Sequence, residues 1–248
     1  PAGVAAKRFL LPQSNILFSA TLNPPDYYRD LLGLPVNTQL TSIQAPYSAD
    51  QIELQIHNID TRYDSRPLTL QPIAECIEYQ YHAEPGNYLI FLSSMTYLNQ
   101  LHDEFRNRCP DIETIRQTQE MSHQARLHFI DQFKNQRGLV GFALLGGIFA
   151  EGVDLPGDNL IGVGVVTLSL QPRTTITKAL SRRYGLMFGE DKVFQYTYLY
   201  PAICKVCQAA GRLIRTSTDT GTIMLFDLRY STPEIQALLP EWWFRHKT

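Results

Sequence analysis

The chain has 248 residues and is neither strongly charged nor unusually polar. Hydrophobic residues make up 44% of it and charged residues 19%, with a formal net charge of −2 and a pI near 6.3. This length and composition allow a substantial buried core and argue against a disordered protein. The small net charge excludes a surface that is basic throughout, so any nucleic-acid site must be focal. No apolar run reaches the length of a membrane span and the first residues lack a signal-peptide pattern, so we expect a cytoplasmic protein without a membrane partner.

Short apolar runs typical of buried strands alternate with segments of helical periodicity. The predicted strands are 15–21, 87–94, 139–146, 160–168 and 221–228. The predicted helices are 95–105, 122–136 and a segment that extends to residue 215. Residues 34–63 are less regular and are compatible with either an edge strand or a connection. The alternation of strands and helices predicts an α/β fold, with a mostly parallel central sheet flanked by helices on both faces.

The four cysteines and six histidines are dispersed along the chain. Only Cys204 and Cys207 form a Cys-x-x-Cys pair, and they lie in a predicted helix without a second such pair or two histidines nearby. Because a zinc site normally takes four ligands, we interpret the cysteines as buried or half-buried free thiols. We expect no metal site in this chain.

Polar or glycine-rich segments follow three of the predicted strands. They are SATL, which contains Thr21; the pair Ser93 and Ser94; and LGGIFAEGVDLPG at 145–157. Ligands of parallel sheets gather at the carboxyl ends of strands, where such segments lie. In the last segment Gly147 permits close backbone approach, and Glu151 and Asp154 supply acceptors for a ribose, a water molecule or an arginine. Taken singly, each segment is equally typical of a helix cap or a tight turn.

The segment QAAGRLIRTSTDTG at 208–221 carries two arginines three residues apart. On a helix, with about 100° per residue, Gln208, Arg212 and Arg215 share one stripe. The opposite stripe is apolar and is predicted to face the core: Ile203, Val206, Ala210, Leu213 and Ile214. A guanidinium has a fixed charge and a planar fork of donors that suits phosphate. The stripe therefore predicts a phosphate-binding helix, with a solvated face of surface ion pairs as the alternative.

The order of four segments resembles a known family. ILFSATL, YLIFLSSMTYLNQL, LGGIFAEGVDLPGDNL and QAAGRLIR are similar, in this order, to motifs III, IV, V and VI of the XPD/DinG-type superfamily two DNA helicases, and in particular to bacterial DinG-like proteins. The resemblance spans almost the whole chain. GRLIR is also followed by a strand pattern that ends in Asp-x-Arg, as in the family. The chain departs from the family after motif V, where the usual Leu-Pro-Phe turn is replaced by LSLQPRT at 168–174.

This resemblance implies that the chain is the second RecA-like domain of an ATP-dependent DNA helicase. Residues 1–40 would carry motif III and the interdomain connection, and 41–248 the RecA-like domain. Arg212 and Arg215 are implied to be arginine fingers on the phosphates of the nucleotide. The other implied contacts, to the nucleotide or between its site and the DNA track, are Gln208, Gly211, Asp154 and Glu151.

The chain contains neither a P-loop of the form GxxxxGK[ST] nor an acidic metal-holding box. We therefore expect ATP and Mg²⁺ to be held mainly by a first RecA-like domain outside this chain, and we expect no iron–sulfur cluster within it. The chain alone is expected to hydrolyse no ATP.

Single-stranded DNA is the second expected partner, with DNA repair as the expected setting. The expected contacts, through hydroxyls and backbone amides, are Thr21, Ser93, Ser94, Gly147 and Gln117. A non-catalytic nucleic-acid-binding module with a degenerate helicase fold is the alternative function.

Overall fold

The structure is a computed structural model that describes residues 16–150 and 154–244. The chain divides into two compact units. The larger unit comprises Pro46–Ser169 and Lys205–Thr248, and the smaller unit comprises Pro1–Ala45 and Leu170–Cys204. No helix within the described residues is long and apolar enough to cross a membrane.

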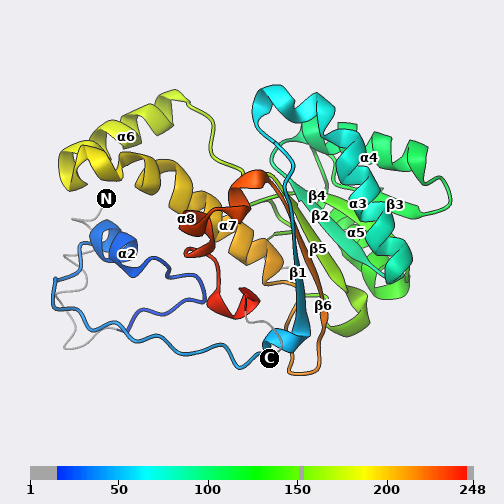
Figure 1. Cartoon of the computed structure of the whole chain (residues 1–248), viewed down its shortest axis with the longest axis horizontal. Helices are drawn as coiled ribbons and strands as arrows, with labels where there is room; N and C mark the ends of the chain where they lie inside the picture. Colours follow the sequence, from blue (N-terminus) through cyan, green and yellow to red (C-terminus); the bar gives the residue numbers. More distant parts are fainter. Residues whose placement is uncertain (1–15, 151–153, 245–248) are drawn as a thin grey trace. The chain divides into compact units, whose positions relative to one another are not determined.

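The larger unit is built on a parallel sheet, which has six strands in the described residues, in the order β1-β6-β5-β2-β4-β3. The strands are β1 (Ile52–His57), β2 (Tyr88–Leu92), β3 (Glu113–Arg116), β4 (Leu139–Leu144), β5 (Gly162–Val166) and β6 (Gly221–Phe226). Every residue of the inner strands β2 and β5 is buried, as expected of strands that are covered on both faces. Figure 1 shows the strands lying side by side in this order. The predicted α/β fold with a parallel sheet is confirmed.

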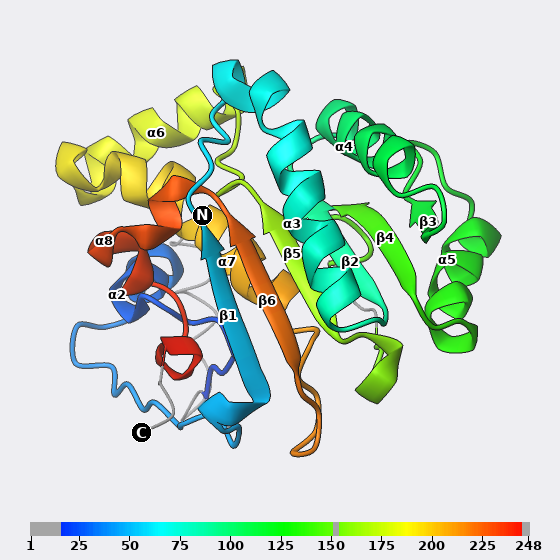
Figure 2. The ribbon, with the colours of Figure 1, turned by 45° about the vertical axis from the view of Figure 1, so that its right-hand side comes forward.

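Helices of the larger unit cover both faces of this sheet. The helices α3 (Leu70–Ala83) and α4 (Met95–Arg108) lie in front of it in Figure 2. They form one core with alternate residues of β2, β4 and β6, among them Ile90, Phe142 and Met224. The helix α5 (His123–Asn135) packs on the other face, where a Cβ at Gly141 would lie 2.5 Å from the ring of Phe133. The last residues of α7 (Tyr200–Ala210) also lie behind the sheet in Figure 2.

Short helical segments complete the chain. The helix α8 (Pro233–Gln236) follows β6. Short 3-10 helices lie at Ala49–Gln51, Tyr63–Leu68, Gly157–Asn159, Glu190–Lys192, Leu228–Ser231 and Glu241–Phe244.

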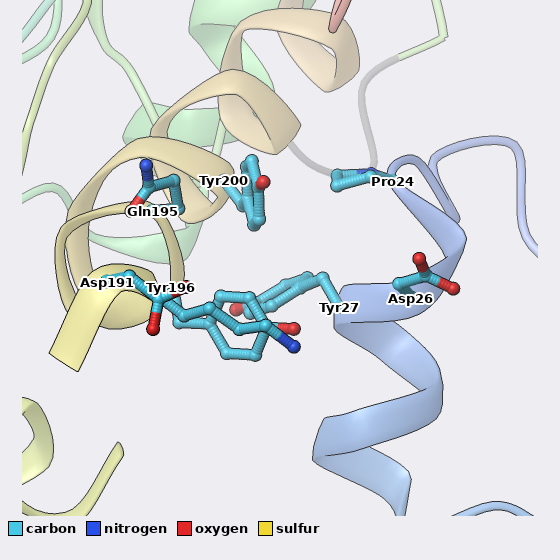
Figure 3. Close-up of a pocket in the computed structure, with 8 residues that line it drawn as sticks. Pro24, Asp26, Tyr27, Asp191, Gln195, Tyr196 and Tyr200 are labelled. Atoms are coloured by element: carbon cyan, nitrogen blue, oxygen red, sulfur yellow. The ribbon is translucent and has the colours of Figure 1, made fainter. Parts of the chain in front are cut away.

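The smaller unit joins two segments that are far apart in sequence. It contains α2 (Pro25–Leu32), α6 (Thr175–Phe188), a π-helical segment (Gln195–Leu199) and the first turn of α7. The ring of Tyr27 packs edge-on at 5.0 Å from Tyr196 and 5.2 Å from Tyr200, and Figure 3 shows these rings side by side. The carboxylate of Asp30 accepts hydrogen bonds from the Tyr196 hydroxyl at 2.6 Å and from the Lys192 ammonium at 3.2 Å. The packing of these rings and the hydrogen bonds to the half-buried carboxylate of Asp30 thus hold the two segments together.

The structure differs from the predicted elements at residues 16–21, at the edge strands β1 and β3, and at α2, α3 and α6, which were not predicted as helices. Residues 16–21, predicted as a strand, form none, and Ile16 and Phe18 are 86% and 89% exposed. A strand needs a neighbour for its backbone hydrogen bonds, and this run has none in the described part of the chain. The edge strands β1 and β3 were not predicted as strands, because both contain several polar residues and lack a continuous apolar run. β1 falls in the 34–63 region, where an edge was one of the two alternatives.

Asn87, which precedes β2, is the main polar tie within the larger unit. It is completely buried, and its amide nitrogen donates to the carbonyls of Phe133, Gln136 and Asn159 at 2.9 to 3.1 Å. Its amide oxygen accepts from the backbone N–H of Leu139 at 3.0 Å. One side chain therefore links the start of β2 to the end of α5, the start of β4 and the approach to β5.

We predict that Asn87→Ala destabilises the fold strongly, because it leaves several buried backbone groups without their partner. The expected loss is about 3 kcal/mol or more in the free energy of unfolding, since each unsatisfied buried group costs about 1–3 kcal/mol. Urea denaturation followed by circular dichroism measures it. Asn107→Ala, on the exposed side of α4, is the matched control and should change the free energy by less than about 0.5 kcal/mol. Equal effects of the two substitutions would contradict this role of Asn87.

Candidate nucleotide and nucleic-acid site

The two arginines lie beyond the end of α7, in the loop that leads to β6. The helix ends at Ala210, and residues 211–220 form turns. The predicted helix is therefore wrong beyond Ala210, and Arg212 and Arg215 do not share a helical stripe with Gln208. The predicted burial of the apolar residues is confirmed, although Leu213 and Ile214 lie beyond the helix. The buried residues are Ile203, Val206, Ala210, Leu213 and Ile214.

Gly211 marks the point where the helix gives way to the loop. Its N–H still donates to the carbonyl of Cys207 at 2.9 Å, and the N–H of Arg212 donates to the carbonyl of Ala209 at 3.2 Å. A Cβ at Gly211 would lie 2.9 Å from the Cys207 carbonyl oxygen, which is too close for a side chain without a shift of the backbone. Gly211 thus permits the turn that presents the arginines, and Gln208 lies half-buried in the last turn of the helix.

Both arginines contact the loop between β4 and β5. The Nε of Arg212 donates to the backbone carbonyl of Ala150 at 3.0 Å. The Nε of Arg215 lies 3.6 Å from Oδ1 of Asp154, and the side chains of this pair are 33% and 76% exposed. The structure therefore brings together the two segments that the sequence singled out separately. Glu151, the other acidic residue predicted here, lies outside the described residues.

Asp219 organises the arginine loop, and the sequence analysis did not identify it. Its side chain is buried and accepts hydrogen bonds from the backbone N–H of Arg215 at 2.7 Å, the N–H of Thr216 at 2.9 Å and the Thr216 hydroxyl at 2.6 Å. Burial alone would raise the pKa of Asp219, but these hydrogen bonds outweigh it and lower the pKa below its ordinary value. The sequence signal was the run Thr-Ser-Thr-Asp, because such side chains bond to nearby backbone and compete with helix formation.

A second buried side chain ties this loop to the start of the sheet. Gln51, just before β1, donates from its amide nitrogen to the carbonyls of Asp219 at 2.7 Å and of Thr216 at 3.1 Å. The loop is therefore held on both sides, by a carboxylate from within and by an amide from outside. Such double anchoring restricts where the backbone of Arg215 can lie.

The predicted DNA-contacting residues of the larger unit gather at one edge of the sheet. Ser93 and Ser94 follow β2, Gly147 lies just beyond β4, and Gln117 follows β3. The three strands are neighbours and parallel, so their carboxyl ends meet at this edge. Thr21, the fifth predicted residue, belongs to the smaller unit, where its hydroxyl lies 3.6 Å from the sulfur of Cys204.

The polar groups at this edge differ in what they already bind. The hydroxyl of Ser94 caps α4 by accepting from the N–H of Tyr97 at 3.3 Å. The amide oxygen of Gln117 accepts from the N–H of Leu144 at 2.9 Å, and the N–H of Gly147 donates to the Leu144 carbonyl at 3.1 Å. The hydroxyl oxygen of Ser93 is buried and has no hydrogen-bond partner among the residues that the structure describes. Of these groups, Ser93 therefore offers the clearest unmet hydrogen-bonding capacity.

The Asp-x-Arg sequence fixes the neighbouring part of the same edge. Asp227 is buried at the end of β6 and accepts from the Arg229 guanidinium at 2.6 and 2.7 Å and from the hydroxyl of Thr61. Arg229 also donates to the hydroxyl of Thr167, whose φ of 72° is unusual for a β-branched residue. The hydroxyl of Tyr230 donates to the Thr167 carbonyl at 3.2 Å. These contacts hold the strained end of β5 in place.

The cysteines and acidic residues carry no metal centre in the part of the chain that is described. None of the four cysteines forms a disulfide with another described residue; Cys109 is buried and the others are half-buried. Within residues 16–150 and 154–244, no group of three or more His, Cys, Asp or Glu side chains is placed to hold a metal ion.

We predict that Asp219→Asn lowers the free energy of unfolding at pH 7 by about 1–3 kcal/mol, because hydrogen bonds to a charged acceptor weaken. The folded-state pKa of Asp219 is depressed, so its contribution is present above the unfolded pKa and disappears as pH falls through the folded value. The difference between wild type and variant should therefore shrink below about pH 4. Urea titrations across pH measure this difference.

The matched control for this experiment is Asp158→Asn, at an exposed position in the β4–β5 loop. It should leave the unfolding free energy nearly unchanged at every pH. A wild type–variant difference for Asp219→Asn that stays constant down to pH 2 would show that its charge does not hold the loop.

Comparison with known proteins shows the family of this chain. Residues 77–246 match the model of the family described as "Helicase C-terminal domain". The chain is 27% identical over 242 residues to "3'-5' exonuclease DinG" of Bacillus subtilis (strain 168), which covers 92% of this chain and 25% of that protein. It is 24% identical over 258 residues to "General transcription and DNA repair factor IIH helicase subunit XPD" of Arabidopsis thaliana, covering 94% and 33%.

A solved structure titled "XPD_Helicase" aligns with a TM-score of 0.74 at 19% identity, over 96% of this chain and 43% of that one. This likeness shows the fold, which is RecA-like. The chain spans about a quarter to a third of the curated relatives named above. It belongs to the helicase C-terminal domain family, in the XPD/DinG group of superfamily two.

Proposed function

We propose that this chain is the second motor domain of an ATP-dependent DNA helicase that translocates on single-stranded DNA. In this proposal residues 1–40 carry motif III and the interdomain connection, and residues 41–248 form the motor domain. Family membership supports the general class. The observation that carries the finer assignment is the anchored loop that holds Arg212 and Arg215 against the β4–β5 loop. ATP and Mg²⁺ would be held mainly by a first RecA-like domain, which faces these arginines across a cleft.

The chemistry of phosphoryl transfer explains why two arginines serve this role. Negative charge spreads over the oxygens of the transferred group, and a planar guanidinium placed beside them stabilises that charge. Asp219 holds the backbone N–H of Arg215, so the loop is positioned before nucleotide arrives. A group positioned in advance needs little reorganisation at the moment of reaction.

The contacts of the arginines with Asp154 and Ala150 are weak enough to be exchanged for phosphate. The pair between Arg215 and Asp154 is long, at 3.6 Å, and largely exposed, so it contributes about 0–1 kcal/mol. Arg212 bonds to a neutral carbonyl, whereas charge-assisted bonds to phosphate are roughly twice as strong as neutral ones. Phosphate therefore wins this competition once it is within reach. Asp154 then becomes the residue that links the nucleotide to the loop that follows β4.

The carboxyl edge of β2, β4 and β3 is the proposed DNA track of this domain. Ser93 offers a hydroxyl without a described partner, and Ser94 and Gly147 lie beside it at the ends of neighbouring strands. Hydroxyl and backbone contacts to phosphates carry no sequence information. Such a grip suits a motor that moves along any sequence. Gln117 and Thr21 stay in the proposal as secondary contacts.

We predict that Arg212→Ala or Arg215→Ala, in the full-length protein that contains this domain, lowers DNA-stimulated ATP turnover by about two or more powers of ten. Affinity for single-stranded DNA without nucleotide should stay nearly unchanged. Arg215→Ala should cost less than about 0.5 kcal/mol of stability, because its ion pair is exposed. Arg212→Ala should cost about 1 kcal/mol or more, because it removes the hydrogen bond to the Ala150 carbonyl. Steady-state ATPase assays and fluorescence anisotropy supply the two readouts.

Lysine at position 212 or 215 is the matched comparison, since it keeps the charge but not the planar fork. It should rescue turnover only in part. Parallel losses of turnover and DNA affinity would assign the arginines to DNA binding instead. DNA affinity with unchanged turnover in every variant would favour the alternative of a non-catalytic nucleic-acid-binding module.

Two adjacent serines separate DNA binding from structure. We predict that Ser93→Ala weakens binding of single-stranded DNA about three- to tenfold, the effect of losing one hydrogen bond, without lowering stability. Ser94→Ala should instead lower the free energy of unfolding by about 1 kcal/mol, because it removes the cap of α4. Anisotropy and thermal denaturation of both variants test this pair. A Ser93→Ala variant that binds DNA like the wild type would remove Ser93 from the track.

A further inference from the structure

We propose that the smaller unit carries a second surface for single-stranded DNA, formed by α6 and the π-helical segment that leads into α7. We call it the basic–aromatic surface and define it by five residues: Arg173, Lys178, Arg182, Phe194 and Tyr198. The identity of the ligand rests on the proposed function, because a translocating motor holds an unpaired strand. The surface itself rests on charge, exposure and ring geometry within this unit.

Charge is strongly segregated in this part of the sequence. Between Asp158 and Glu190 the chain has no acidic residue, yet it contains four basic ones: Arg173, Lys178, Arg182 and Arg183. All four are exposed. The whole chain has a net charge of −2, so this run forms a focal basic region on a slightly acidic protein. A focal region of this sign attracts a polyanion.

The helix α6 directs two of these cations to one side. Its inward stripe includes Thr177 and Ser181, and two further members, Tyr184 and Phe188, stack against Tyr196 with ring centroids 6.3 and 5.3 Å apart. With about 100° per residue, Lys178 and Arg182 project along one flank of this stripe. Arg183 projects along the opposite flank. The helix therefore presents a pair of cations one turn apart, with a third that faces elsewhere.

Aromatic rings lie next to this cationic flank. The hydroxyl of Ser181 donates to the Tyr198 hydroxyl at 3.5 Å and to the Thr197 hydroxyl at 3.3 Å, which joins α6 to the π-helical segment. Phe194 lies one turn before Tyr198, with ring centroids 6.1 Å apart and planes inclined by 31°. Phe194 is 49% exposed although it is a large apolar side chain. An open ring thus lies beside a partly open tyrosine.

The positive charges of Arg173 and Lys178 act on the hydroxyl of Tyr198. The hydrogen bond from Ser181 is the main cause that lowers the pKa of Tyr198, and the positive charges of Arg173 and Lys178 add to it. Arg173, which precedes the helix, and Lys178, in its first turn, are therefore near enough to Tyr198 for their charges to act on its hydroxyl. Arg182 lies one turn beyond Lys178 on the same flank of α6.

This combination favours single-stranded nucleic acid over the other ligands of a basic surface. Cations neutralise the phosphates of the strand, and open rings stack on bases, which a duplex keeps paired and covered. A single unpaired strand would use both features, because its phosphates meet the cations while its bases meet the open ring. The expected binding is independent of sequence, because every base has a stacking face.

Salt dependence of binding tests the cationic half of the proposal. Anisotropy of a labelled oligo-dT with the full chain gives the slope of log affinity against log salt. Each phosphate contact on a single strand contributes about 0.7 to that slope, so Arg173→Ala/Lys178→Ala/Arg182→Ala should flatten it by up to about 2. Arg183→Ala, on the opposite flank, is the matched control and should change it little. An unchanged slope in the triple variant, or an equal change in the control, would overturn the assigned surface.

A fluorescent reporter tests the aromatic half. Phe194→Trp should show quenched emission when oligo-dT is added, after subtraction of the signal from the wild-type chain, which contains Trp242 and Trp243. Duplex DNA of equal charge should quench it far less. Phe194→Ala should weaken oligo-dT binding about tenfold, the scale of one stacked base. Failure of oligo-dT to quench the reporter would exclude stacking, and quenching only by an added first motor domain would make this a protein-docking surface.

The outcomes separate this inference from the proposed function. Suppose that Arg212→Ala retains full ATP turnover, while the triple variant shows the flatter salt dependence and the reporter is quenched. Then the motor assignment fails and the DNA surface stands. If Arg212→Ala abolishes turnover while the triple variant binds like the wild type, the motor assignment stands and the surface is wrong. If the wild-type chain binds no oligo-dT at any salt concentration, the surface is overturned outright.

Discussion

The buried carboxylate of Asp219 is the interaction on which the candidate nucleotide site depends. Without it, the backbone N–H groups of Arg215 and Thr216 would be left without these acceptors at the point where α7 ends. With it, the chain leaves the helix in one defined direction, and the arginines face the β4–β5 loop. A carboxylate suits this task because a charged acceptor makes short, strong hydrogen bonds to backbone N–H groups. The buried negative charge of Asp219 thus fixes the position of the positively charged Arg215 at the surface of the same loop.

The parallel sheet imposes the second constraint, because its inner strands are covered on both faces and their side chains are used in packing. Polar side chains that could bind a ligand are therefore confined to the ends of the strands. There each polar group either already makes a hydrogen bond within the fold or has no described partner. Ser94 and Gln117 are used to cap α4 and to hold β4, whereas Ser93 has no described partner. The same distinction applies to the smaller unit, where the inward stripe of α6 packs and its flanks remain exposed.

The sequence predicts those parts of the fold whose residues determine their own conformation. The strands β2, β4, β5 and β6 are apolar runs, and α4 and α5 begin at serine caps, so their periodicity is sufficient. Residues 16–21, β1 and β3 depend on what lies beside them, and local pattern does not reveal a neighbour. The arginine pair and Asp154 could be singled out as candidates because their residue types and order are distinctive, and the structure shows the contact between Arg215 and Asp154. Asp219, Gln51 and Asn87 were missed, because their roles arise from contacts with backbone groups that the sequence does not mark.

The central claim is that the anchored loop delivers Arg212 and Arg215 to a nucleotide held by another motor domain. A structure of the full-length protein with single-stranded DNA and a non-hydrolysable ATP analogue tests it most directly. The account predicts guanidinium nitrogens of both arginines at about 2.7–2.9 Å from phosphate oxygens, with the Asp219 bonds to Arg215 and Thr216 intact. It would be contradicted by a nucleotide-bound, closed structure in which neither guanidinium contacts a phosphate oxygen, with Arg212 still bonded only to Ala150 and Arg215 still paired only with Asp154.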